Sequence, residues 1–206
     1  METARAAKVG IVGAGRVGCT MAYGLLYSGV ASQVLIVNRD RSRAEGEAAD
    51  LEHAVPFSRD CRVEVGGYED LTDSDVVAIT AGPRMDPTAT RLDLVGRSAA
   101  MYREMVPAIA AAAPSAVLVI ATNPVDIMTQ AAIQYSGLPS HQVMGSGTLL
   151  DTARFRYLLG HYYQVEPNSV EAYIIGEHGD SQVAVFSSAR SAGVRLAEYA
   201  RQLKGE

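Results

Sequence analysis

The sequence has few cysteines, no long apolar segment and no surplus of basic residues. Cys19 and Cys61 are the only cysteines in 206 residues. They match neither a disulfide framework nor a metal-ligand spacing, so we expect small buried side chains and no metal site. No apolar segment approaches the ~20 residues of a membrane helix. The formal net charge of −5 leaves no excess of Lys and Arg to neutralise phosphates, which argues against nucleic acid as a partner.

The remaining composition is typical of a folded soluble protein. Hydrophobic residues make up 48% and charged residues 20% of the chain. A chain of 206 residues can bury one complete core and part of a second. The N-terminal residues lead directly into a strand-like segment without the apolar core of a signal peptide. Together with the sparse cysteines, this predicts a location in the reducing cytoplasm.

Short apolar segments alternate with helical patterns along the first three quarters of the chain. The predicted strands are Lys8–Val12, Gln33–Asn38, Arg62–Val65, Val76–Thr80, Val117–Ala121 and Val143–Gly145. Gly13–Gly29 is predicted as a glycine loop followed by a helix. The other predicted helical stretches are Arg41–His53, Leu92–Ala113 with an interruption at Pro107, and Leu150–Leu159. This alternation predicts an α/β fold, a mainly parallel sheet with helices on both faces.

The pattern changes after about Gly147. Gln164–Gly176 and Ser181–Ser188 read as antiparallel strands around a polar turn, and Ala197–Gly205 reads as a helix. We therefore predict two domains. Residues 1–147 form the doubly wound domain, and residues 148–206 form part of a smaller α+β domain.

A glycine-rich motif, Gly13-Ala-Gly15-Arg-Val-Gly18, follows the first strand and opens a helix. This is the context of a dinucleotide fingerprint in a Rossmann-type sheet. Gly13 permits the tight turn, Gly15 lets the backbone approach the pyrophosphate, and Gly18 allows close packing of the helix on the sheet. A glycine-rich turn needed only for packing is the alternative.

The end of the second predicted strand departs from this fingerprint. An acidic residue is usual there to bind the adenosine ribose, but the chain has Asn38 followed by Arg39 and Asp40. Neutral Asn38 beside Arg39 would tolerate or attract a 2′-phosphate. We therefore expect NAD as the cofactor with weakened selectivity against NADP. Alternatively, Asp40 binds the adenosine ribose in place of the usual acidic residue from a shifted register, or Arg39 is merely solvated.

Four further segments carry a family resemblance. They are Ala89-Thr-Arg91-Leu92, Ala121-Thr-Asn-Pro-Val-Asp126, Asp151-Thr-Ala-Arg-Phe-Arg156 and Gly176-Glu-His-Gly-Asp180. In this order behind the glycine loop, they resemble the L-lactate/malate dehydrogenase family, and within it the bacterial L-lactate dehydrogenases. The resemblance runs from about Lys8 to the end of the chain. The family continues beyond that point, so the last third, the rest of the substrate domain, is expected to be absent.

The resemblance implies a catalytic set of His178, Asp151 and Arg91. Reduction of a 2-keto acid needs hydride at the carbonyl carbon and a proton at its oxygen, and histidine is the side chain that titrates near neutral pH. His178 matches the family's acid–base residue, and Asp151 matches the carboxylate that orients its ring. Arg91 matches an arginine on a loop that closes over the substrate and polarises the carbonyl.

Substrate binding is likewise implied by family position. Arg154 matches the arginine that clamps the substrate carboxylate. Asn123 matches an asparagine that bonds the substrate oxygen, and the peptide bond to Pro124 is expected to be cis. Met85 stands where lactate enzymes have Gln and malate enzymes have Arg, which disfavours malate because a second carboxylate would lack a partner. Pyruvate and L-lactate are the first expectation, and larger aliphatic 2-keto acids are the alternative.

The cofactor contacts expected from the fingerprint and the resemblance are Gly13, Gly15, Val17, Gly18, Asn38, Arg39, Arg43, Tyr68, Ala81, Gly82, Asn123 and Ser146. The family also implies a homo-oligomer, a dimer or tetramer. Arg156 matches an arginine with which some relatives bind fructose 1,6-bisphosphate, but Glu171 stands where they have His. A carboxylate repels a phosphate, so we expect little or no activation by this sugar phosphate. A fragment that binds the dinucleotide without turnover is the non-enzymatic alternative.

Overall fold

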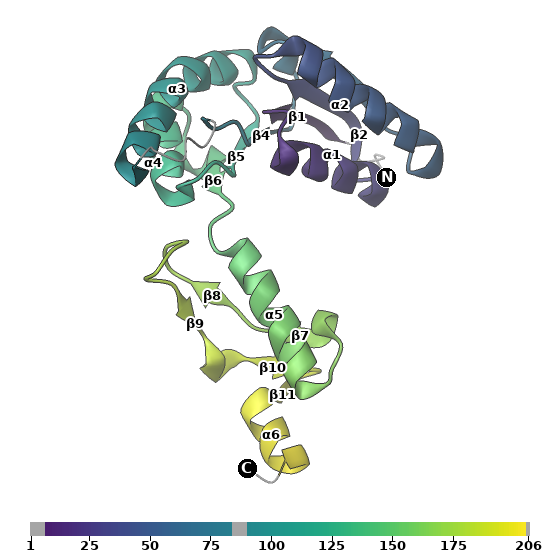
Figure 1. The fold of residues 1–206 in the computed structure, drawn as a ribbon, viewed down its shortest axis with the longest axis vertical. Helices are drawn as coiled ribbons and strands as arrows, with labels where there is room; N and C mark the ends of the chain where they lie inside the picture. Colours follow the sequence, from purple (N-terminus) through teal and green to yellow (C-terminus); the bar gives the residue numbers. More distant parts are fainter. Residues whose placement is uncertain (1–6, 84–89, 205–206) are drawn as a thin grey trace. The chain divides into compact units, whose positions relative to one another are not determined.

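The computed structural model describes residues 7–83 and 90–204. The chain divides into two compact units, Met1–Gly145 and Ser146–Glu206 (Figure 1). The sequence pattern changes at about the same place. In the described part of the chain, no helix is both long enough and apolar enough to cross a bilayer.

The first unit is built on a six-stranded parallel sheet in the order β3-β2-β1-β4-β5-β6. Its strands are β1 (Ala7–Val12), β2 (Ala31–Val37), β3 (Arg62–Gly66), β4 (Val76–Ile79), β5 (Val117–Ile120) and β6 (Val143–Gly145). The order reverses between β1 and β4, which is the point where open α/β sheets bind ligands at the carboxyl ends of their strands. The predicted doubly wound, Rossmann-type fold is confirmed.

Two apolar clusters cover the two faces of this sheet. Alternate strand residues point to opposite faces, so Val34 and Ile36 pack with the first two helices, whereas Leu35 and Val37 pack with the next two. The helices on one face are α1 (Arg16–Ser28) and α2 (Arg41–Ala54), and those on the other are α3 (Arg91–Ala112) and α4 (Val125–Ser136). Both faces are thereby buried.

Two helices of this unit differ from the sequence prediction. The predicted interruption at Pro107 is wrong, because α3 runs without a break through this residue. Pro107 is exposed, while Val106 and Ile109 beside it are fully buried. Burial of this face offsets the backbone hydrogen bond that proline cannot make. Helix α4 was not predicted, although Val125, Met128 and Ala132 have helical spacing and are buried.

The second unit is smaller and mixed in structure. It contains α5 (Leu149–Tyr163), the strands β7 (Val170–Glu171), β8 (Ile174–Ile175), β9 (Val183–Ala184), β10 (Arg190–Ser191) and β11 (Val194–Arg195), and α6 (Leu196–Lys204). The strands form antiparallel β8-β9 and β11-β10-β7 sheets. The predicted long strands are therefore wrong in extent. Pro167 begins a 3₁₀ turn in the first of them, and Gly176 leaves extended geometry at φ 96°.

Candidate active site

The three glycines of the loop between β1 and α1 meet different surroundings. A Cβ added to Gly13 would lie 2.6 Å from the backbone nitrogen of Ala81, and this residue has φ +117°. A Cβ on Gly18 would overlap the carbonyl of Gly13. No described atom lies within 4 Å of a Cβ added to Gly15. Packing therefore requires glycine at positions 13 and 18, whereas Gly15 faces open space.

The N-terminus of α1 offers backbone donors at this open position. Gly15 is its N-cap residue and supplies no capping side chain, and the first turn carries no acidic residue. The first N–H groups of a helix have no partner within the helix, and its dipole favours negative charge. Val17 lies in this turn and is exposed. The arrangement fits a pyrophosphate held against the loop.

Two threonines hold the carboxyl edge of the sheet together around this loop. The Thr80 hydroxyl donates to the carbonyl of Gly13 at 3.0 Å, and the Thr122 hydroxyl donates to the carbonyl of Ala81 at 2.7 Å. Sequence reasoning did not select either residue, because the contacts join segments some 40 or more positions apart. Gly82 follows Ala81 and is exposed at the same edge.

The residue after Thr122 carries an expected backbone feature. The Asn123–Pro124 peptide bond is cis, as the resemblance implied. Asn123 itself is exposed. Its side chain thus stands at the carboxyl end of β5, on the edge where the glycine loop also lies.

Asn38, at the end of β2, is tied to backbone on both sides. Its Oδ1 accepts the N–H of Ala14 at 3.3 Å, and its Nδ2 donates to the carbonyl of Asp40 at 2.8 Å. The Asp40 carboxylate accepts the N–H of Arg43 at 3.2 Å and caps α2. The side chain of Asp40 therefore stabilises the N-terminus of α2.

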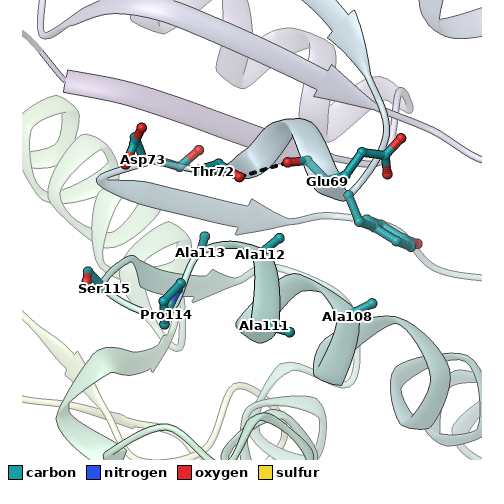
Figure 2. A pocket seen from close by; sticks show the side chains of 11 residues that line it. Glu69, Thr72, Asp73, Ala108, Ala111, Ala112, Ala113, Pro114 and Ser115 are labelled. Atoms are coloured by element: carbon teal, nitrogen blue, oxygen red, sulfur yellow. Dashed lines mark hydrogen bonds between the residues drawn. The ribbon is translucent and has the colours of Figure 1, made fainter.

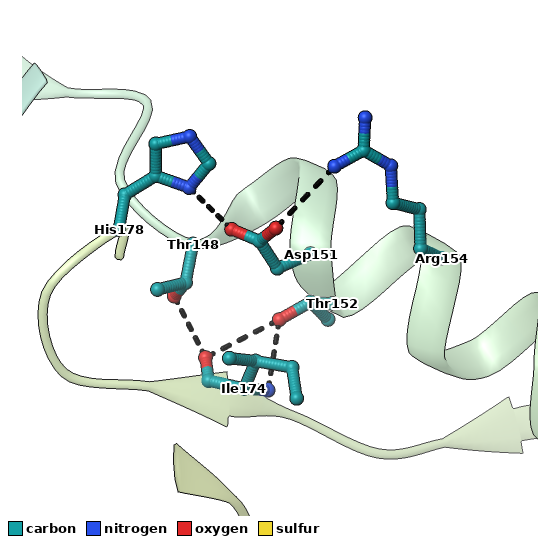
Figure 3. Close-up of polar contacts among 6 residues, drawn as sticks. All are labelled: Thr148, Asp151, Thr152, Arg154, Ile174 and His178. Atoms are coloured by element: carbon teal, nitrogen blue, oxygen red, sulfur yellow. Dashed lines mark hydrogen bonds and ion pairs between the residues drawn. The ribbon is translucent and has the colours of Figure 1, made fainter. Parts of the chain in front are cut away.

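Within the second unit, His178 and Asp151 form a close pair (Figure 3). Nδ1 of His178 lies 2.5 Å from Oδ2 of Asp151. Asp151 is in the first turn of α5, and its side chain is 11% exposed, against 28% for His178 in the loop between β8 and β9. A carboxylate on Nδ1 orients the ring and stabilises its protonated form.

Arg154 lies one turn further along α5, on the same side of the helix. Its Nη1 is 3.5 Å from Oδ1 of Asp151, and its side chain is 63% exposed (Figure 3). This is a single, long contact rather than a two-pronged one. The arginine side of this contact is exposed to solvent, which screens the interaction. The guanidinium can therefore turn to another anion at small cost.

Two further threonines attach β8 to α5 and so place the His178 loop. The Thr148 hydroxyl donates to the carbonyl of Ile174 at 2.7 Å, and the N–H of Ile174 donates to the Thr152 hydroxyl at 3.0 Å (Figure 3). Thr148 and Thr152 are four residues apart and share the helix face that packs on β8. The four-residue spacing of the two threonines can be read from the sequence, but the strand that they contact cannot.

The other predicted site residues either lie apart from these groups or fall outside the residues that the structure describes. Met85 is not among the described residues, and of Arg91 only the backbone is described, as the first residue of α3. Nε of Arg43 lies 3.9 Å from the Glu47 carboxylate. Ser146 lines a cavity of about 550 Å³ in the second unit.

Tyr68 lines a cavity of the first unit. This cavity of about 840 Å³ lies between the 3₁₀ turn Glu69–Leu71 and the C-terminal end of α3, where small side chains form its wall (Figure 2). Burial raises the pKa of Tyr68. None of the other predicted cofactor residues lines this cavity.

The comparisons with known proteins divide the chain as the fold does. Residues 7–145 match the NAD binding domain model of lactate/malate dehydrogenases, and residues 148–205 match the model of their alpha/beta C-terminal domain. The chain belongs to the lactate/malate dehydrogenase family.

The relatives within this family are L-lactate dehydrogenases. The chain is 53% identical to that of Thermus aquaticus over 94% of its own length and 63% of the relative, and 49% identical to that of Chloroherpeton thalassium over 96% and 65%. Among solved structures, the minor L-lactate dehydrogenase of Enterococcus mundtii aligns with a TM-score of 0.90 at 40% identity, covering 96% of this chain and 63% of that one. The chain thus spans less than two thirds of the length of the relatives it matches.

The residues of this lactate/malate dehydrogenase chain fit the dinucleotide that its first domain is named for. The open face of Gly15 and the uncapped start of α1 leave a cradle that a Cβ would fill. No group of three or more His, Cys, Asp or Glu able to hold a metal occurs among the described residues. Both cysteines are free thiols, and burial raises the pKa of Cys19 to about 11.

Arg156, a family position in the second unit, has partners of its own. The Nε of Arg156 donates to the carbonyl of Ala172 at 2.9 Å, and its guanidinium lies 4.9 Å from the ring centre of Tyr173. Glu171 is exposed on β7. The arginine is thereby engaged by backbone and ring within its own unit.

Proposed function

We propose that the chain carries the catalytic machinery of an L-lactate dehydrogenase, with NAD as cofactor and pyruvate as the first substrate. The observation that carries this proposal is the His178–Asp151 pair at 2.5 Å, in a chain whose first unit has an open glycine loop. The names of its relatives support the same activity.

The pair suits proton transfer to a ketone. A dinucleotide held at the glycine loop would supply or accept the hydride at the carbonyl carbon. His178 donates a proton to the carbonyl oxygen from Nε2, because Nδ1 is engaged by Asp151. Asp151 holds the ring in place through this contact with Nδ1. In the reverse direction, the neutral ring takes the proton from the hydroxy acid.

Arginines and an amide complete the proposed site. Arg154 binds the substrate carboxylate with its two-pronged guanidinium, which its long 3.5 Å contact with Asp151 leaves possible. Arg91 polarises the carbonyl, and Asn123 bonds the substrate oxygen. Met85 selects against a second carboxylate, so pyruvate and larger aliphatic 2-keto acids are favoured over oxaloacetate.

Assembly and regulation follow from surface and charge. Among the described residues of the second unit, ten large apolar side chains are exposed, including Leu149, Tyr157 and Leu158. Apolar surface of this extent supports a homo-oligomer, which light scattering after size exclusion would measure. Glu171 and the engaged Arg156 support little or no activation by fructose 1,6-bisphosphate. The free thiols suit a reducing cytoplasm.

The test is consumption of NADH at 340 nm with pyruvate, 2-ketoisocaproate and oxaloacetate. We expect turnover of pyruvate, and loss of at least about 100-fold in kcat for His178→Gln and for Asp151→Asn. The exposed His141, in a 3₁₀ turn of the first unit, is the matched control, and His141→Gln should leave kcat unchanged. NADH binding without turnover would favour a binding-only fragment, and efficient use of oxaloacetate would contradict the role of Met85.

A further inference from the structure

The adenosine end of the proposed dinucleotide site has an unusual charge. β2 ends at Val37, and the next residue is Asn38, where a carboxylate usually binds the ribose hydroxyls. Such a carboxylate excludes NADP because it repels the 2′-phosphate. The neutral amide of Asn38 removes this repulsion.

The local backbone explains why an amide stands here. Nδ2 of Asn38 donates to the carbonyl of Asp40 at 2.8 Å, while Oδ1 accepts from Ala14. An aspartate could accept from Ala14 but could not donate, and it would face the carbonyl oxygen of Asp40 with a second negative oxygen. The next carboxylate along the chain, that of Asp40, caps α2 through the N–H of Arg43.

Arg39 adds a positive charge at the same strand end. It is exposed and forms no ion pair with any described residue. The neighbouring arginines differ, because Arg41 lies 3.0 Å from Glu45 and Arg43 lies 3.9 Å from Glu47. Arg39 is therefore the guanidinium available to a phosphate, which such a group binds with two parallel hydrogen bonds.

Resting on the proposed function, we propose that the dinucleotide site accepts the 2′-phosphorylated cofactor, NADPH, as well as NADH. Asn38 permits the phosphate, and Arg39 binds it. The pair thus determines cofactor specificity at the adenosine end.

The test is binding rather than turnover. Calorimetric titration of the full 206-residue chain with NADH, NADPH, ADP-ribose and 2′-phospho-ADP-ribose gives four dissociation constants. We expect NADPH to bind within about fivefold of NADH. Arg39→Leu should weaken the binding of NADPH and 2′-phospho-ADP-ribose about tenfold more than it weakens the binding of NADH and ADP-ribose. Asn38→Asp should weaken the phosphorylated ligands further.

The control removes an arginine charge from the opposite edge of the sheet, where the strands begin. Arg62 begins β3, and its side chain is 75% exposed, so Arg62→Leu should affect both ligands equally and slightly. Circular dichroism identifies a variant that does not fold, and Arg39→Leu carries the test if Asn38→Asp fails. NADH bound at least about 100-fold more tightly than NADPH would overturn this proposal and leave the proposed function intact. Failure to bind either nucleotide would overturn both.

Discussion

At the scale of single residues, the glycine loop separates structural from ligand-binding glycines. Gly13 combines φ +117° with backbone 2.6 Å from an added Cβ, whereas Gly15 has extended geometry at φ −101° and open space around it. The same substitution at the two positions therefore tests two different properties, the stability of the fold and the affinity for the dinucleotide.

We expect Gly13→Ala to destabilise the fold by about 2 kcal/mol, because it adds both strain and a steric clash. Gly15→Ala should change stability by about 0.5 kcal/mol or less, yet weaken NADH about tenfold, because the methyl group occupies the approach of the pyrophosphate. Thermal unfolding and fluorescence titration measure the two effects. Equal loss of stability at both positions would show that Gly15 is also a packing residue.

Threonine hydroxyls form hydrogen bonds to the backbone near the glycine loop and near the His178–Asp151 pair. Thr80 and Thr122 hold the carboxyl edge of the sheet, and Thr148 and Thr152 hold β8 on α5. Each hydroxyl satisfies a backbone group that the regular ladder leaves unpaired. The residues that carry the chemistry are therefore positioned by neighbours that carry none.

At the scale of elements, α3 begins with a complete capping box. The Thr90 hydroxyl donates to the Asp93 carboxylate at 2.6 Å, the N–H of Thr90 donates to the same oxygen at 3.0 Å, and the N–H of Asp93 donates to the Thr90 hydroxyl at 3.2 Å. The hydrogen bond from the Thr90 hydroxyl, with that from its backbone, lowers the pKa of Asp93 below 3.8. The start of α3 thus depends on an ionised carboxylate.

Thr90→Ala should lower stability by about 1 kcal/mol at neutral pH, because it removes the cap. A carboxyl whose pKa is depressed in the folded state stabilises the fold above its ordinary pKa, and this contribution is lost as pH falls through the folded value. The difference in Tm between wild type and variant should therefore be constant above about pH 5 and shrink below pH 3.8.

The control for this prediction is Thr20→Ala. Thr20 is exposed within α1, so its replacement by a better helix former should not destabilise the chain at any pH. A difference between wild type and Thr90→Ala that persists unchanged at low pH would contradict the role of Asp93 in the box.

At the scale of the whole molecule, the two units differ greatly in their apolar cores. Counted over the described residues, the first unit has clusters of 17 and 13 buried residues, whereas the second has a cluster of five. A smaller core buries less apolar surface for each ordered residue and is less stable by itself. The unit that carries His178 and Asp151 is therefore the less protected one.

Amide hydrogen exchange should show this difference. We expect the amides of β1 and β4 to exchange about tenfold or more slowly than those of β8 and β9, because their opening requires loss of a larger core. Mass spectrometry of peptides from the two units measures it. Equal protection in both units would mean that they unfold as one cooperative body.

Local patterns predicted the doubly wound sheet and the glycine loop, whereas the residues of the His178–Asp151 pair came from the resemblance to a known family. The sheet and the loop depend on residue spacing within one segment and on the apolar alternation that burial on both faces imposes. The change of pattern after about Gly147 predicted the division into two domains, but the strand order of the sheet came only from the structure.

Only the tertiary structure decided which polar groups meet. The Thr80 hydroxyl reaches Gly13 across 67 residues, Asn38 reaches Ala14 across 24, and α3 continues through Pro107 because its buried face holds it on the sheet. Short-range patterns cannot specify such contacts, since a hydrogen bond between distant segments forms only after the apolar core has brought their backbones together.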